Sequence, residues 1–140
     1  MKKDYLLTSK TAIQLYNEYA KDLPVIDFHN HISVDDIMRD RRFENITELW
    51  IASDPYKHRL MRISGVDEYY ITGNATDYEK FEQFAKVFPS LVGTPVFDWS
   101  RMELSQIFGI DELLCAENAE SIYERANKKL GKPISQTMKF

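Results

Sequence analysis

The sequence of 140 residues has little of several features that would direct its interpretation. It has one cysteine, Cys115, so no internal disulfide bond can form and a reducing compartment is expected. No run approaches the ~18 apolar residues of a membrane span, and the two N-terminal lysines are not followed by the apolar stretch of a secretory signal. With a formal net charge of −4, the chain lacks the basic excess that nucleic acids and anionic membranes require. We therefore expect a soluble, cytoplasmic protein without nucleic-acid or membrane partners.

Glycine and proline are also sparse, with five residues of each, and they stand singly at element boundaries. There is no glycine-rich phosphate loop, nucleophile elbow, zinc-type cysteine pair, internal repeat or flexible linker. What the chain does have is apolar bulk, with 44% hydrophobic and 13% aromatic residues. This composition is typical of one globular domain with a sizeable core.

Helical signals dominate the sequence. Ser33, Asp54 and Thr76 are typical N-caps, and Gly109 suits the position after a helix C-terminus. Together with apolar residues recurring at helical spacing, these signals predict helices over residues 9–20, 34–41, 46–52, 55–64, 77–88, 98–108 and 117–130.

One strand is expected, over residues 24–32, where apolar and polar side chains alternate. Ile26, Phe28 and Ile32 would share its apolar face. A lone strand needs a partner for its backbone hydrogen bonds, and that partner is either a weak strand at residues 69–72 or a part of the protein outside this chain. The expected fold is therefore mainly α with strand 1 in residues 1–32, a helical subdomain over 33–131, and an irregular tail over 132–140.

The pair His29 and His31 is the constellation that indicates chemistry. On a strand, residues two apart project to the same side, so two imidazoles could bind one divalent metal ion. Asp27 would lie on the same face, one step deeper. The competing interpretation is a pair of solvent-facing histidines on an ordinary amphipathic strand. The position at the C-terminal end of a strand with an apolar opposite face favours the metal site, because barrel active sites are built there.

For the other side chains that could carry chemistry, we expect roles in packing or at the surface. We expect a surface or partly packed His58, a solvated or salt-bridged run of Arg39, Arg41 and Arg42, core anchors at Trp50 and Trp99, and a buried, inert thiol at Cys115.

Several sequence blocks together resemble the N-terminal part of the uronate isomerases (glucuronate isomerase), which belong to the amidohydrolase superfamily. The resemblance covers roughly residues 4–130. The matching blocks include Ile26-Asp27-Phe28-His29-Asn30-His31 and Phe108-Gly109-Ile110-Asp111-Glu112-Leu113-Leu114. The His-x-His pattern is shared by the whole superfamily, whereas Arg41-Arg42-Phe43-Glu44-Asn45 and Gly65-Val66-Asp67-Glu68 are far more specific.

The resemblance implies a (β/α)8 barrel that interconverts aldo- and keto-hexuronates. In that family the paired histidines after strand 1 bind a divalent metal ion, usually zinc, and the matching positions here are His29 and His31. The metal polarises a carbonyl as a Lewis acid, and a carboxylate moves a proton between C1 and C2 through an enediol. Tyr56 carries over as a substrate contact.

Two departures from the family follow. Pro55 stands where the family usually has a histidine. His58 lies one helical turn further on and could occupy similar space, but we do not expect it to replace that histidine, because Pro55 at a helix start puts the two positions in different settings. A (β/α)8 barrel also needs ~250 residues, so the catalytic base and a further metal ligand are expected outside this chain. The chain therefore reads as an N-terminal fragment that is nearly inactive alone, and unpaired strand edges would favour homo-oligomers.

Two alternatives stay open at this point. The parent could be another metal-dependent hydrolase of the superfamily, using His29 and His31 to activate water. The chain could also be a helical interaction domain with incidental histidines, which would show no heat on titration with zinc.

Overall fold

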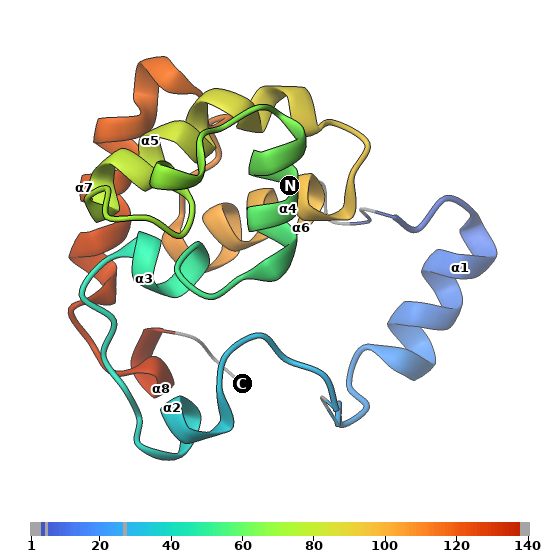
Figure 1. Ribbon diagram of the computed structural model, residues 1–140. Helices are drawn as coiled ribbons and strands as arrows, with labels where there is room; N and C mark the ends of the chain where they lie inside the picture. The colour runs from blue at the N-terminus through green and yellow to red at the C-terminus, as the bar shows by residue number, and fades with distance from the viewer. Residues whose placement is uncertain (1–3, 5, 27, 138–140) are drawn as a thin grey trace. The chain divides into compact units, whose positions relative to one another are not determined.

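The computed structural model describes residues 4, 6–26 and 28–137, and every regular element in these ranges is a helix (Figure 1). The chain divides into two compact units, residues 1–30 and residues 31–140. The mainly helical class expected from the sequence is confirmed. None of the helices in the described part of the chain is long and apolar enough to span a membrane.

The first unit consists of one amphipathic helix and its flanking segments. Helix α1 (Lys10–Leu15) continues into a π-helical turn, η1 (Tyr16–Ala20). The Ser9 hydroxyl accepts a hydrogen bond from the Ala12 N–H at 3.1 Å and so caps α1, as expected. None of the described residues of this unit is buried, and its apolar stripe remains exposed.

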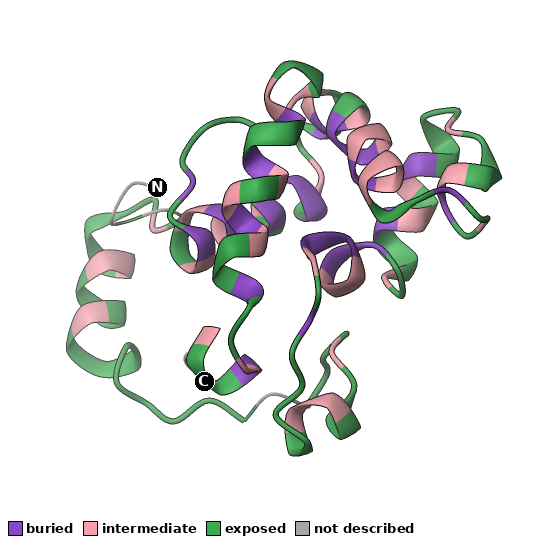
Figure 2. Ribbon diagram, turned by 90° about the vertical axis from the view of Figure 1, so that its left-hand side faces the viewer, coloured by how far each residue is buried: buried purple, intermediate pink, exposed green. Residues whose placement is uncertain are grey.

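The second unit holds the hydrophobic core, and Figure 2 shows its buried residues gathered between the helices. Its elements are α2 (Val34–Met38), α3 (Ile46–Trp50), α4 (Pro55–Ile63), η2 (Glu68–Tyr70), α5 (Asp77–Val87), η3 (Phe88–Leu91), α6 (Pro95–Glu103), η4 (Leu104–Phe108), η5 (Ala116–Asn118), α7 (Ala119–Leu130) and α8 (Ile134–Thr137).

Helix α5 is the centre of this unit, because it contacts α3, α4 and α7. Its Phe81, Phe84 and Ala85 are fully buried, in agreement with the helical spacing of apolar residues in this segment. The Phe84 ring meets the Trp50 ring edge-on at 6.3 Å between centroids and the Phe88 ring at 5.7 Å. Trp50 is therefore the core anchor that the sequence predicts.

Local capping chemistry sets the helix boundaries. Ser33, Asp54 and Thr76 all cap helices, and Thr76 forms a full capping box with Glu79. Gly109 ends η4 with a φ of 67°, a left-handed conformation that glycine adopts without steric cost. Helix α6 begins at Pro95, three residues before the expected start, because Thr94 caps it.

The strand expected over residues 24–32 is not present in the described residues of that segment. A strand is held by hydrogen bonds to a neighbouring strand, and the described chain contains none. Without such a neighbour, Val25, Ile26 and Phe28 lie between 87% and 96% exposed.

The weak strand considered at residues 69–72 is also wrong. Asp67 caps a 3₁₀ turn there, accepting from the Tyr69 N–H at 2.8 Å. The following N–H groups of Thr72 and Gly73 donate to the Glu68 carbonyl, which closes the turn locally. The terminal segment expected to be irregular contains α8 over Ile134–Thr137, a single turn that follows Pro133. Residues 138–140 lie outside the described part.

Candidate functional site

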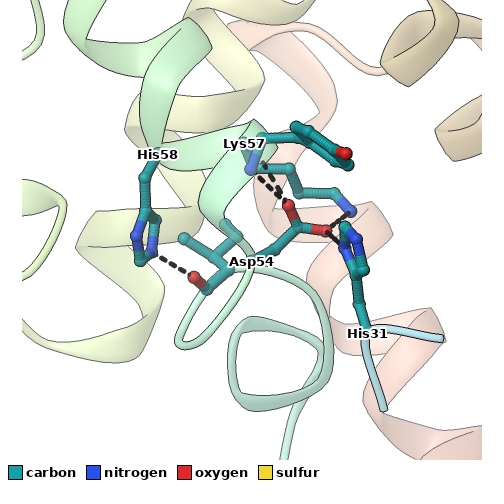
Figure 3. Close-up of polar contacts among 6 residues, drawn as sticks. His31, Asp54, Lys57 and His58 are labelled. Atoms are coloured by element: carbon teal, nitrogen blue, oxygen red, sulfur yellow. Dashed lines mark hydrogen bonds and ion pairs between the residues drawn. The ribbon is translucent and has the colours of Figure 1, made fainter. Parts of the chain in front are cut away.

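The candidate site is built around one carboxylate, that of Asp54, which caps helix α4. Its Oδ1 atom accepts hydrogen bonds from the Tyr56 N–H at 2.8 Å and the Lys57 N–H at 3.0 Å. Its Oδ2 atom lies 3.1 Å from Lys57 Nζ and 3.3 Å from His31 Nδ1. Figure 3 shows His31 and Lys57 converging on Asp54, while His58 lies apart. All of these residues belong to the second unit.

The structure brings together two of the residues expected to function, His31 and Tyr56. Their ring centroids are 4.9 Å apart with planes tilted by 36°. His31 precedes α2, whereas Tyr56 stands in the first turn of α4, and a side-chain contact between these segments joins them. The side chain of His31 is 32% exposed, so the imidazole is reachable from solvent.

The other expected metal ligand, His29, belongs to the first unit and is exposed in a segment without regular structure. Asp27, expected on the same face, lies outside the described residues. Within the described part of the chain, no three His, Cys, Asp or Glu side chains form a group that could hold a metal ion. The metal site expected at His29 and His31 therefore stays a prediction.

The surroundings of Asp54, at the N-terminal end of α4, favour the charged form of its carboxyl group. Burial alone would raise the pKa of the Asp54 carboxyl, but the Lys57 ammonium and the hydrogen bonds from Lys57 and His31 outweigh burial and hold that pKa below its usual value. The Lys57 side chain is only 9% exposed, and its Nζ lies 5.3 Å from the centre of the Trp50 ring. The ammonium is therefore held by both a carboxylate and an aromatic face.

A second carboxyl group, that of Glu103 at the end of α6, interacts electrostatically with Lys57, Asp54 and His31. Its Oε2 atom is buried and finds no hydrogen-bond partner among the described residues. Burial raises the pKa of the Glu103 carboxyl, and this effect outweighs the lowering by the nearby Lys57 ammonium. The charged form of Glu103 is thus disfavoured in the folded protein.

We expect Glu103→Gln to stabilise the protein at pH 7. In the native state Glu103 holds its proton to higher pH than in the unfolded chain, so native stability falls as pH rises from the unfolded pKa through the folded one. A neutral amide avoids that loss, which is about 1 kcal/mol for a partly compensated buried polar group. Thermal melts should show a melting temperature several degrees higher at pH 7, and the difference should vanish near pH 4.

The control is Glu124→Gln on the exposed side of α7, which should leave the melting temperature unchanged at both pH values. A wild-type protein more stable than the Glu103→Gln variant at pH 7 would show that Glu103 is ionised and stabilising there.

The structural interpretations of the other residues have mixed outcomes. His58 is partly packed, its Nε2 against the Ile51 carbonyl, and Arg41 is paired with Asp36 and Glu48, as expected. Two expectations are wrong, those for Trp99 and Cys115.

Trp99 is not a core residue, because Val96, Phe97 and Ser100 take the buried face of α6 and leave Trp99 49% exposed. Its ring centroid lies 6.4 Å from that of Tyr56. Cys115 is only partly buried, because it caps the surface turn η5, where its N–H donates to Asn118.

Sequence reasoning missed Lys57 and Glu103 and saw Asp54 only as a cap. The spacing of Asp54 and Lys57 in the first turn of a helix is a local signal for an ion pair. The approach of His31, 23 residues away from Asp54, has no such signal.

Comparisons with known proteins agree over nearly the whole chain. A sequence model of the family described as glucuronate isomerase matches residues 1–139. The chain is 54% identical over 128 residues to a uronate isomerase of Caldanaerobacter subterraneus and 45% identical over 130 residues to that of Bacillus subtilis. These matches cover 91% and 93% of this chain but 28% of each relative. The chain thus spans little more than a quarter of the length of the curated relatives it matches.

Two solved structures resemble the fold. A uronate isomerase from Thermotoga maritima matches with a TM-score of 0.86 and 43% identity, covering 94% of this chain and 29% of that one. A glucuronate isomerase from Caulobacter crescentus matches with a TM-score of 0.83 and 28% identity, covering 97% and 31%. These relatives and solved structures are all named isomerases.

Proposed function

Because the chain belongs to the glucuronate isomerase family, we propose that it supplies the N-terminal part of a uronate isomerase that interconverts aldo- and keto-hexuronates. The substrate pairs are glucuronate with fructuronate and galacturonate with tagaturonate. The family match over residues 1–139 carries the proposal. The contact between His31 and Tyr56, the positions expected to hold metal and substrate, supports it.

The complete enzyme is, in this proposal, a (β/α)8 barrel of the amidohydrolase type. Residues 24–32 pair as its first strand once neighbouring strands are supplied from outside these 140 residues. The exposure of Val25, Ile26 and Phe28 supports this, because such apolar side chains normally pack against another surface. In this proposal, the apolar side of helix α1 likewise packs against parts of the enzyme outside these 140 residues.

In this proposal His29 and His31 are two of the ligands of a divalent metal ion. Neutral imidazole is a common metal ligand, and the hydrogen bond from His31 Nδ1 to Asp54 leaves the lone pair of the neutral ring on Nε2. A divalent cation, zinc in this proposal, would supply Lewis-acid polarisation of the substrate carbonyl. Further ligands come from outside the chain.

The residues of this chain bind and orient the substrate, while the proton is moved by a base from elsewhere in the enzyme. Tyr56 contacts a substrate oxygen beside His31, and the half-exposed Trp99 ring borders the same place. The base, a carboxylate, removes the C2 proton of the aldose and returns a proton to C1 of the ketose through an enediol. Pro55 leaves no histidine beside Tyr56 for this work.

The proposal predicts that this chain is nearly inactive alone and active in a chimera. In the chimera the chain replaces the matching N-terminal 28% of the Caldanaerobacter relative. Isomerisation of glucuronate is followed by the appearance of the keto product. We expect turnover by the chimera and none above background by the isolated chain, because the base and further ligands are missing from it.

The remaining 72% of the relative, expressed alone, serves as the control and should be inactive. Turnover by the isolated chain near that of the intact relative, or a folded chimera without turnover, would contradict the proposed function.

A further inference from the structure

Asp54 does more than cap a helix, because one carboxylate oxygen binds backbone N–H groups of α4 and the other contacts two side chains. Oδ1 accepts the N–H groups of Tyr56 and Lys57 and so fixes the first turn of α4. Oδ2 faces away from those amides and receives Lys57 Nζ and His31 Nδ1. One carboxylate therefore ties the segment before α2 to the start of α4.

The contact with Oδ2 selects the tautomer of His31. A carboxylate can only accept a hydrogen bond, so the neutral imidazole must carry its proton on Nδ1 to meet it. Its lone pair then stands on Nε2, the nitrogen on the far side of the ring. A hydrogen bond to a charged acceptor is stronger than one between neutral groups, which favours the Nδ1–H form.

The contacts with Oδ1 place Tyr56. Its backbone N–H is held at 2.8 Å from Asp54, in a turn where Pro55 also fixes φ. The Tyr56 ring then lies 4.9 Å from the His31 ring held by the other oxygen. The same carboxyl group thus contacts the backbone of Tyr56 and the ring of His31.

Lys57 keeps the carboxylate charged and in place. The Asp54 side chain is only 14% exposed, and a buried charge without a partner is costly. The Lys57 ammonium supplies that partner at 3.1 Å and is itself packed over Trp50, which is 4% exposed. The carboxylate is thereby anchored to the core, so it can orient the more exposed His31.

We propose that Asp54 is a positioning residue, which sets the tautomer of His31 and holds the Tyr56 ring against it. The roles of His31 as metal ligand and Tyr56 as substrate contact rest on the proposed function. The positioning itself does not, and it is measured on the 140-residue chain without metal or substrate.

The test is Asp54→Asn. Asparagine is as good an N-cap as aspartate, so its oxygen retains the Tyr56 and Lys57 amides. Its amide nitrogen then takes the place of Oδ2, gives up the contact with the Lys57 ammonium and donates to His31 Nδ1, which must accept. Long-range ¹H–¹⁵N spectra of the imidazole, recorded where it is neutral, report which nitrogen carries the proton. We expect the Nδ1–H form to dominate in the wild type and its ratio to the Nε2–H form to fall at least about tenfold.

Asp67→Asn is the matched control, because Asp67 caps η2 through the Tyr69 N–H at 2.8 Å in the same way. It should leave the His31 spectrum unchanged. Nuclear Overhauser effects between the His31 and Tyr56 rings should be present in the wild type, in the control and in the Asp54→Asn variant, which shows that a change of tautomer is not a loss of the local structure.

Two results would overturn the proposal. One is a wild-type His31 in the Nε2–H form, which needs no variant and so decides the matter even if Asp54→Asn does not fold. The other is a folded Asp54→Asn variant with the wild-type tautomer ratio. An inactive chimera, by contrast, would refute the isomerase proposal while these spectra stand.

Discussion

Phe84→Ala is expected to destabilise the chain by about 3–5 kcal/mol, the usual cost of truncating a buried phenylalanine. The Phe84 side chain is fully buried on α5, the helix that contacts α3, α4 and α7. Truncation removes its contacts with Trp50 and Phe88 and leaves a cavity between helices that cannot collapse independently. The loss is a large part of the roughly 5–15 kcal/mol that a domain of this size has.

Thermal melts followed by circular dichroism measure this effect, which corresponds to a fall of roughly 10–25 °C in melting temperature. Val92→Ala is the control, since Val92 is 68% exposed and its truncation should cost less than about 0.5 kcal/mol. Equal melting temperatures for the two variants would mean that α5 is not the centre of the cooperative core.

The elements that the sequence predicts well depend on local interactions. The side chains of the N-caps accept hydrogen bonds from N–H groups two or three residues further on, as those of Ser33, Asp54 and Thr76 do. Both partners therefore lie within one short stretch of sequence. Gly109 is equally local, because only the backbone conformation of one residue decides the helix end. The first residue of a helix was therefore predictable from a short stretch of sequence. Even for α6, the predicted start is only three residues from Pro95, where the helix begins.

The strand at residues 24–32 was not predictable from its own residues. Alternation shows which faces a strand would have, but the strand exists only where another backbone pairs with it. The described chain offers no such backbone, and Phe28 remains 96% exposed. The same limit applies to Trp99, whose exposure depends on which face of α6 the rest of the unit covers.

The candidate site was half predictable for the same reason. The sequence pattern and the family resemblance together singled out His31 and Tyr56, but neither contains the carboxylate that joins them. Asp54 was visible as a cap because its amide partners are neighbours, whereas its bond to His31 spans 23 residues. The buried Glu103 was invisible because its environment is tertiary.

His31→Ala in the chimera is expected to lower isomerase turnover by about a thousandfold or more. The variant removes one of the two imidazoles proposed as metal ligands, and it also removes the ring against which Tyr56 packs. Loss of Lewis-acid stabilisation amounts to several kcal/mol, and each 1.4 kcal/mol is a factor of ten in rate. Elemental analysis of the purified variant should show a matching loss of bound zinc.

His58→Ala is the matched control for that loss. It removes another imidazole of the second unit, but the His58 ring contacts the Ile51 carbonyl and not Asp54. It should retain bound zinc and most of the turnover, with at most a modest loss of stability. Two imidazoles of one small unit would then differ a thousandfold in effect, and the difference would follow from which of them binds the metal. Equal losses in both variants would instead indicate general damage to the fold, and full zinc content in the His31→Ala enzyme would remove His31 from the metal site.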